Sequence, residues 1–163
     1  MLFRSPQFAR WSLWIDQTPG LEFKQMIVWD KGPMGMGWHY RRSYETVLVA
    51  QKKGAACRWY DTSNAVENVI RPRHFGIRKI IPSKTQHPTE KPVELGQWFM
   101  TLHTQEGDTV IDPFAGSGTT GVGAVRLGRK FLGCEIDPHW VAIARARIAA
   151  AQNATPLFAE GNT

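Results

Sequence analysis

The run DTVIDPFAGSGTTGVGAVRLGRKFLGCEID, residues 108–137, constrains the fold more than any other part of the chain. A short apolar stretch precedes a group of glycines, an apolar run with helical spacing ends at Gly128, and a second apolar stretch follows. Asp137 and Pro138 then suit the cap and the first position of a helix. This alternation predicts a parallel sheet with helices on its faces, which is an α/β fold. The expected elements are strands at 109–111 and 130–135 and helices at 117–127 and 138–148.

Three interpretations of these glycines compete. Gly116, Gly118 and Gly121 spell G-x-G-x-x-G, which is typical of dinucleotide-binding enzymes. Asp112 stands before them, however, where its carboxylate would repel a pyrophosphate but would suit an ammonium group. A phosphate-binding P-loop is excluded because no Lys-Ser or Lys-Thr follows, and a plain tight turn explains one glycine but not the whole string. Glu135, at the end of the second strand, can accept hydrogen bonds from ribose hydroxyls.

The remaining segments predict strands in the first half of the chain and a helix before the glycine run. Apolar, β-branched stretches favour buried strands, whereas glycines and scattered prolines favour loops. Pro92 suits the beginning of a helix whose apolar residues share one face. The expected elements are strands at 1–4, 23–30 and 44–50, a loop at 31–43, a loop-rich insertion at 53–86 and a helix at 93–102.

The chain is basic, with a net charge of +6, and this favours a polyanionic partner such as nucleic acid. Many of its basic residues crowd one segment beside Trp59 and Tyr60, for which a solvated linker is the competing interpretation. No apolar run of about 18 residues exists, so no membrane-spanning segment is expected. Two separate cysteines and scattered histidines predict a reducing compartment and no metal site. The basic residues of the segment around Trp59 and Tyr60 are Lys52, Lys53, Arg58, Arg71, Arg73, Arg78, Lys79 and Lys84.

Several segments resemble the N6-adenine and N4-cytosine DNA amino-methyltransferases. DPFAGSGTT at 112–120 is similar to the family's cofactor motif, and HPTEKPVEL at 87–95 is similar to the segment that precedes it in the β-type motif order. FLGCEIDPHWVAIARARI resembles the segment after that motif, and GLEFKQMIVWDK and YETVLVAQKKG resemble strands that follow the family's catalytic motif. The resemblance implies a Rossmann-like, S-adenosylmethionine-dependent fold. It also implies a cytoplasmic restriction-modification enzyme, bacterial or phage, that methylates adenine N6 in DNA, with cytosine N4 as the alternative.

The resemblance assigns roles to residues of the glycine run and its flanks. Asp112 and Phe114 would line the methionine and adenine parts of the cofactor, and Glu135 would hold the ribose. Lys91 and Pro92 would close the methionine end, although helix initiation alone also explains them. The implied cofactor-binding residues are Lys91, Pro92, Asp112, Phe114, Gly116, Gly118, Thr119, Thr120 and Glu135, and the expected DNA-binding residues are Arg71, Arg73, Arg78 and Lys79.

The family's catalytic motif, a polar residue followed by Pro-Pro and an aromatic, is absent, because no two of the ten prolines are adjacent. We therefore expect a methyltransferase domain over 1–152 that is incomplete on its N-terminal side, followed by a tail at 153–163. A second chain or segment would supply the catalytic motif. The nearest string within the chain is Ser5, Pro6 and Phe8, which are weak catalytic candidates. The alternative is a non-catalytic remnant that binds cofactor or DNA.

Overall fold

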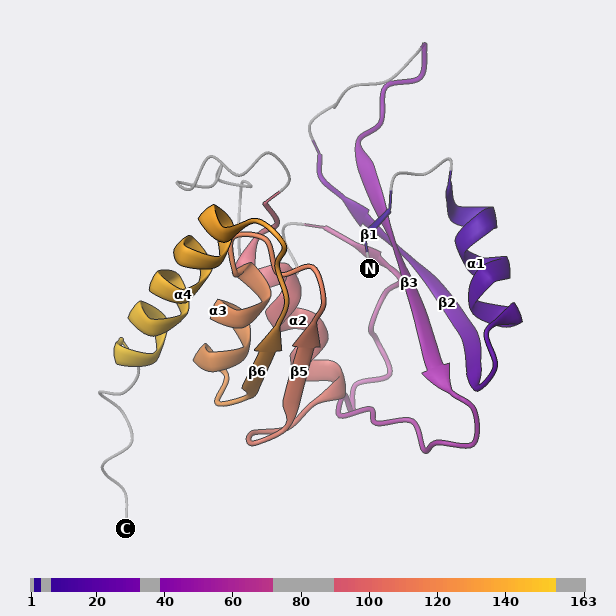
Figure 1. The fold of residues 1–163 in the computed structure, drawn as a ribbon. Helices are drawn as coiled ribbons and strands as arrows, with labels where there is room; N and C mark the ends of the chain where they lie inside the picture. Colours follow the sequence, from indigo (N-terminus) through magenta and orange to yellow (C-terminus); the bar gives the residue numbers. More distant parts are fainter. Residues whose placement is uncertain (1, 4–6, 33–38, 72–89, 155–163) are drawn as a thin grey trace. The chain divides into compact units, whose positions relative to one another are not determined.

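The computed structural model describes residues 2–3, 7–32, 39–71 and 90–154. The chain forms two compact units (Figure 1). Unit 1 comprises Met1–Cys57 and Asp61–Ile80, and unit 2 comprises Arg58–Tyr60 and Ile81–Thr163. Each unit has its own sheet, so each is described separately below.

Unit 1 is built on a four-stranded sheet in the order β1-β3-β2-β4. The long strands β2 and β3 pair antiparallel from Leu21 opposite Lys52 to Asp30 opposite Tyr44. A register shift between Phe23 and Gln25 interrupts this ladder, and β4 joins β2 in parallel. The elements are β1 (Leu2–Phe3), α1 (Phe8–Gln17), β2 (Leu21–Asp30), β3 (Tyr44–Lys52) and β4 (Val69–Ile70).

Both long strands were expected from their β-branched, apolar sequences, and the structure confirms them. The core of unit 1 comes from alternate residues of β2 and consecutive residues of β3, and Ile70 of β4 completes it. Two elements were not expected. The helix α1 carries no fully buried residue, but its half-buried Phe8, Trp11 and Ile15 recur at helical spacing on one face. The strand β4 is two residues long and lies inside the insertion that we expected to be loop-rich. The buried apolar side chains are Ile27, Trp29, Val47, Leu48 and Ile70.

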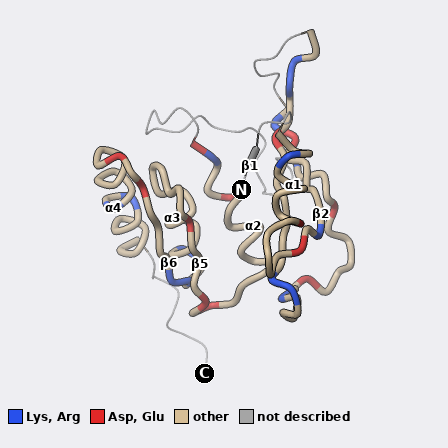
Figure 2. Tube along the Cα trace, turned by 45° about the vertical axis from the view of Figure 1, so that its right-hand side comes forward, with Lys and Arg blue, Asp and Glu red and all other residues tan. Residues whose placement is uncertain are grey.

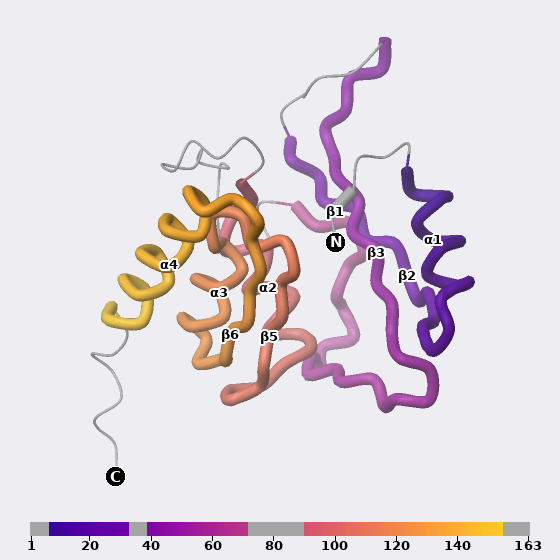
Figure 3. Tube along the Cα trace, viewed as in Figure 1, coloured from indigo at the N-terminus to yellow at the C-terminus, as the bar shows by residue number. Residues whose placement is uncertain are grey.

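Unit 2 contains the predicted alternation of strands and helices (Figure 3). The strands β5 and β6 pair in parallel from Thr109 opposite Lys130 to Asp112 opposite Gly133, as expected. The strand β6 ends two residues earlier than predicted, so that Glu135 follows the strand instead of closing it. The elements are α2 (Val93–His103), β5 (Thr109–Asp112), α3 (Thr119–Arg126), β6 (Lys130–Gly133) and α4 (Pro138–Asn153).

Small residues let the helices of unit 2 pack closely around α3. A Cβ atom on Gly121 would lie 2.8 Å from the ring of Phe131, and one on Gly123 would lie 3.2 Å from Gln97 Cγ. The α3 helix therefore approaches both β6 and α2 along glycines. Leu95 of α2 is almost fully buried. Ile111 of β5, by contrast, is largely exposed. The other buried apolar residues are Met100, Leu102, Val122, Ala124, Ala144 and Ala151. Among the described residues, no helix is both long and apolar enough to cross a membrane.

Candidate functional site

The candidate site lies at the carboxyl ends of β5 and β6. These two strands are parallel, so the loops that follow them lie at the same edge of the sheet. Cys134 N donates to Asp112 O at 3.0 Å, and Ala115 N donates to Cys134 O at 2.8 Å, so the loops after both strands stay joined. The Asp112 carboxylate accepts a hydrogen bond from Phe114 N at 3.0 Å, which folds the chain sharply after the strand. A ligand at such an edge meets loop backbone and carboxylates together.

Positive backbone angles form the loop between β5 and α3. The φ angle is 54° at Gly116 and 81° at Gly118, a conformation that residues with a side chain rarely adopt. Gly118 also lies against α4, because a Cβ there would come within 2.8 Å of Ala144 Cα and Cβ. Glycines in such a string allow either a sharp turn or the close approach of a ligand. The structure confirms the turning, and it adds helix packing as the second requirement at Gly118.

The beginning of α3 offers backbone donors at the same place. The first intrahelical hydrogen bond runs from Val122 N to Gly118 O at 2.9 Å. The amides of Thr119, Thr120 and Gly121 precede it, and such amides at a helix N-terminus lack intrahelical acceptors. Together with the positive end of the helix dipole, they favour a polar or anionic group.

Glu135 holds the two loops together through both carboxylate oxygens. Oε2 accepts a hydrogen bond from Gly116 N at 2.8 Å, and Oε1 accepts one from Asp137 N at 3.0 Å. A carboxylate accepts hydrogen bonds and donates none, so this side chain suits both backbone amides and ligand hydroxyls. An acceptor was expected at Glu135 from the sequence, whereas its support of the glycine loop was not.

Two apolar side chains flank these polar groups. Phe114 is 71% exposed and Ile136 is 96% exposed, and they follow β5 and β6 respectively. Large apolar groups at this exposure gain free energy when a ligand covers them. Phe114 was expected at the site, whereas Ile136 was missed. Its signal in the sequence is its position directly after Glu135.

A charged pair connects the segment before α2 to this loop. Arg147 Nη2 of α4 lies 2.7 Å from Glu90 Oε1, and Thr119 Oγ1 lies 3.5 Å from the same oxygen. Pro92 is the residue that precedes α2, with φ −59° and ψ 138°. It therefore caps the beginning of this helix, as the sequence indicated. Lys91 stands between Glu90 and Pro92 and is half-buried. Neither Glu90 nor Arg147 was identified from the sequence.

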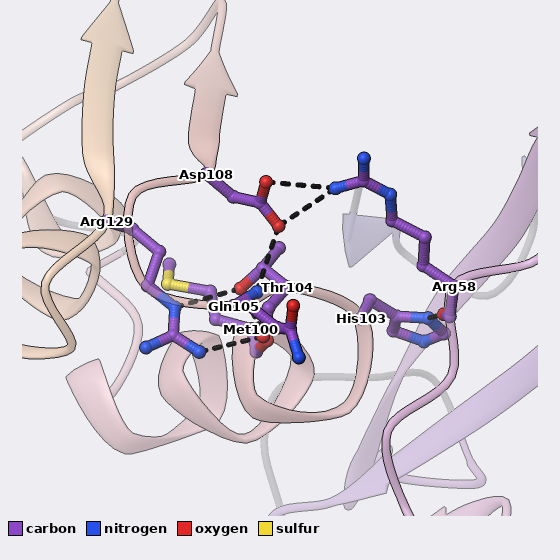
Figure 4. A network of polar contacts seen from close by, with 7 residues as sticks. All are labelled: Arg58, Met100, His103, Thr104, Gln105, Asp108 and Arg129. Carbon is purple, nitrogen blue, oxygen red and sulfur yellow. Dashed lines mark hydrogen bonds and ion pairs between the residues drawn. The ribbon is translucent and has the colours of Figure 1, made fainter.

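A second polar network lies at the other end of β5 (Figure 4). Arg58 Nη1 lies 2.9 Å from both carboxylate oxygens of Asp108, and Asp108 also accepts a hydrogen bond from Gln105 N at 2.9 Å. The backbone hydrogen bond from Gln105 and the bond from Arg58 hold the pKa of the Asp108 carboxyl below its ordinary value, and the Asp108 carboxylate raises the pKa of Arg58. His103 Nδ1 contacts Arg58 O at 2.9 Å, so this network fastens residues 58–60 to α2 within unit 2.

The other predicted site residues are only partly described. Phe8 opens α1 and makes an edge contact with Phe23, with 6.3 Å between the ring centroids. Arg71 pairs with Glu67 at 3.0 Å and lies 3.9 Å from Asp30, so it already has acidic neighbours. Lys and Arg are interspersed with Asp and Glu along the described parts of both units (Figure 2). In those same parts, no group of three or more His, Cys, Asp or Glu could hold a metal ion. Ser5, Pro6, Arg73, Arg78 and Lys79 lie outside the described residues.

These features define a class of protein and then a family. A parallel β-α-β unit with a glycine loop and an acidic residue after the second strand is typical of nucleotide-cofactor folds. Solved structures identify the class as S-adenosylmethionine-dependent methyltransferases, confirming the expected fold. The chain superposes on the M1.HpyAVI complex with S-adenosylmethionine at a TM-score of 0.76 and 28% identity, covering 90% of this chain and 72% of that one. The Thermus thermophilus protein TTHA0409, also solved with S-adenosyl-L-methionine, has a TM-score of 0.57 and 27% identity over 83% of this chain and 56% of that chain.

Residues 2–146 match the DNA methylase family N6_N4_Mtase, and the chain belongs to this family. The Type II methyltransferase M2.DpnII of Streptococcus pneumoniae is 33% identical over 144 residues, which cover 82% of this chain and 54% of the relative. The Type II methyltransferase M.HhaII of Haemophilus parahaemolyticus is 30% identical over 123 residues, which cover 76% of this chain and 50% of the relative. The chain thus spans about half the length of these relatives, and the resemblance stated from the sequence is confirmed.

Proposed function

We propose that unit 2 binds S-adenosylmethionine at the glycine loop between β5 and α3. The observation that carries this proposal is the grouping of two carboxylates, a row of helix amides and two exposed apolar side chains at one edge of the sheet. The Asp112 and Glu135 carboxylates suit the ammonium group and the ribose hydroxyls, and Phe114 and Ile136 suit the adenine ring. The solved relatives that carry this cofactor support the assignment.

The residues of this chain then have separate tasks. Lys91 carries a positive charge that suits the methionine carboxylate, and the amides of Thr119 and Thr120 offer further donors at the beginning of α3. Glu135 orients the ribose while keeping Gly116 in place. When bound, the cofactor supplies an activated methyl group, and the protein's contribution is to hold that group in a fixed position and orientation.

Calorimetry on the folded chain tests this assignment. S-adenosylmethionine and a nicotinamide dinucleotide are titrated separately under identical conditions. We expect the former to bind more tightly, because Asp112 faces an ammonium group in one ligand and a pyrophosphate in the other. Tighter binding of the dinucleotide would contradict the proposal.

We propose further that the substrate is DNA, with methyl transfer to adenine N6 and with cytosine N4 as the alternative. Family membership supports this. An exocyclic amine is a poor nucleophile, because its lone pair is delocalised into the ring. Transfer therefore needs acceptors for its hydrogens and a ring that holds the extruded base. The sequence has no adjacent prolines and so lacks the expected motif. We infer that this chain alone transfers methyl groups slowly. Another chain or segment would supply the hydrogen-bond acceptors and the aromatic ring.

A tritiated-methyl transfer assay on mixed-sequence DNA distinguishes the possibilities. The chain is assayed alone and together with an added segment bearing Asp-Pro-Pro-Tyr. We expect transfer only in the second case, since losing even one transition-state hydrogen bond lowers the rate by about 100- to 1000-fold. Rapid transfer by the chain alone would point to Ser5, Pro6 and Phe8. No transfer in either case would favour a non-catalytic remnant.

DNA binding itself is expected to depend on salt. Lysines and arginines that contact phosphates release counterions, so the affinity falls as salt concentration rises. Fluorescence anisotropy at low and physiological salt measures this fall. The triple variant Arg71→Ala, Arg73→Ala and Arg78→Ala should bind more weakly and with a shallower salt dependence. An affinity for DNA that is independent of salt would contradict a phosphate-binding role for Arg71, Arg73 and Arg78.

A further inference from the structure

A largely buried ion pair adjoins the glycine loop. Arg147 Nη2 and Glu90 Oε1 are 2.7 Å apart, and the two side chains keep only 25% and 6% of their exposure. Removing charged groups from water is costly unless the pair has good geometry and further hydrogen bonds. Net stabilisation alone is therefore a weak explanation for this pair.

The second half of the Arg147 guanidinium holds the loop directly. Its Nη1 donates to Ser117 O at 2.7 Å and lies 2.8 Å from Ser117 Oγ. Ser117 is 3% exposed and stands between the two glycines that have positive φ angles. Arg147 thus meets both oxygens of Ser117 through one nitrogen while it pairs with Glu90 through the other.

This arrangement fixes the direction of the loop amides. A guanidinium is planar and rigid, so its two nitrogens cannot move independently. Fixing the Ser117 carbonyl also fixes the peptide plane that joins Ser117 to Gly118. The amides of Thr119 and Thr120 follow directly, and Thr119 Oγ1 also reaches Glu90 at 3.5 Å.

We infer that the Glu90–Arg147 pair positions two parts of the cofactor site at once, namely the glycine loop and the segment that carries Lys91. This inference rests on the proposed binding of S-adenosylmethionine. The two charges are paired with each other, and Arg147 also contacts Ser117, so their task is positioning rather than contact with the ligand. Breaking the pair would let the loop and the Lys91 segment move apart, and the cofactor would meet a site that has lost its shape.

The test is calorimetry with S-adenosylmethionine on the full chain and on Arg147→Met, Glu90→Gln and the double variant. We expect each single variant to bind at least about tenfold more weakly, which corresponds to about 1.4 kcal/mol. The double variant should bind no more weakly than the weaker single variant, because either change already breaks the link. Arg147→Lys should bind with intermediate affinity, because it keeps the charge but loses the planar fork.

Two control variants separate positioning from charge and from general stability. Arg145→Met removes the same charge from an exposed position on the same helix and should leave the affinity unchanged. Arg58→Met breaks the ion pair with Asp108 at the other end of β5, so it should lower the unfolding midpoint without changing the affinity. Hydrogen exchange of residues 115–121 should accelerate more in Arg147→Met than in either control, because only that variant loosens the loop itself.

The outcomes are distinguishable. If the wild-type chain binds no S-adenosylmethionine, the proposed function is wrong and this inference is wrong with it. If the wild type binds and both Arg147→Met and Glu90→Gln bind equally well, only the inference is wrong. Should circular dichroism show that Arg147→Met is unfolded, Glu90→Gln and Arg147→Lys decide the matter. Wild-type affinity in both of these folded variants would overturn the inference.

Discussion

Replacing Gly118 with alanine tests the loop geometry directly. Gly118 has a φ angle of 81° and immediately precedes α3. The added methyl group would lie 2.8 Å from Cα and Cβ of Ala144 and 3.2 Å from its carbonyl oxygen. These are atoms of α4 close to or in its backbone, so they cannot rotate away as the tip of a long side chain would.

The expected loss of stability has two parts. A residue with a Cβ costs about 1–2 kcal/mol in the left-handed conformation. Forcing an extra methyl group into a packed contact causes a further loss of about 1–3 kcal/mol. Gly118→Ala should therefore lower the free energy of unfolding by about 2–5 kcal/mol. That is a large part of the roughly 5–15 kcal/mol that stabilises a typical domain.

Hydrogen exchange read by mass spectrometry suits this measurement, because peptides from α3 and α4 report on unit 2 alone. A matched control is Gly96→Ala, in which the new methyl group meets only Met100 Cε at an ordinary 3.7 Å. This change should raise stability by about 0.5–1 kcal/mol, since alanine favours the helix more than glycine does.

A second-site change separates the two parts of the loss. Adding Ala144→Gly to Gly118→Ala removes the Cβ on the α4 side but leaves Ala144 Cα in place, so we expect partial recovery only. If Gly118→Ala alone is within about 0.5 kcal/mol of the wild type, the size of an ordinary surface change, the left-handed loop and its contact with α4 are refuted.

Two further predictions concern carboxylates of unit 2. Glu135→Ala should weaken S-adenosylmethionine binding by about 1–3 kcal/mol, because Gly116 N also loses its acceptor; Glu135→Gln should lose less, and calorimetry measures both. Asp108 has a lowered pKa when folded, so its stabilisation is present above its ordinary pKa of 3.8 and is lost as the pH falls through the folded value. Urea unfolding from pH 7 down to about 3 should therefore show a steeper loss for the wild type than for Asp108→Asn, and equal slopes would argue against the Arg58–Asp108 contact.

The elements that were predictable are those with a strong local signal. In unit 2, Asp137 Oδ1 accepts the hydrogen bond from His139 N at 2.9 Å with Pro138 in the first turn, as the sequence indicated. Glycines with positive φ at 116 and 118 stand where the chain must turn. The long strands β2 and β3 follow from their β-branched runs. Each of these signals lies within a few residues, so no distant partner is needed to read it.

The elements that were missed depend on distant partners. The strand β4 is defined by its pairing with β2 near Val28, and its two residues carry no period of their own. The helix α1 is the exception, because Phe8, Trp11 and Ile15 recur at helical spacing and this local signal was overlooked. Ile136 looks like an ordinary residue after a strand until the structure shows its side chain to be 96% exposed beside Glu135.

By itself, the sequence determined the class of fold, the family and the position of the glycine loop, because short-range conformational preferences and motif order are written along the chain. Only the tertiary structure decided what the charged residues do. No residue next to Arg58 or Arg147 in the sequence indicates its partner, yet the fold places them beside Asp108 and Glu90 respectively. A charge acts through the groups within a few ångströms of it, and folding brings those groups together from distant parts of the sequence.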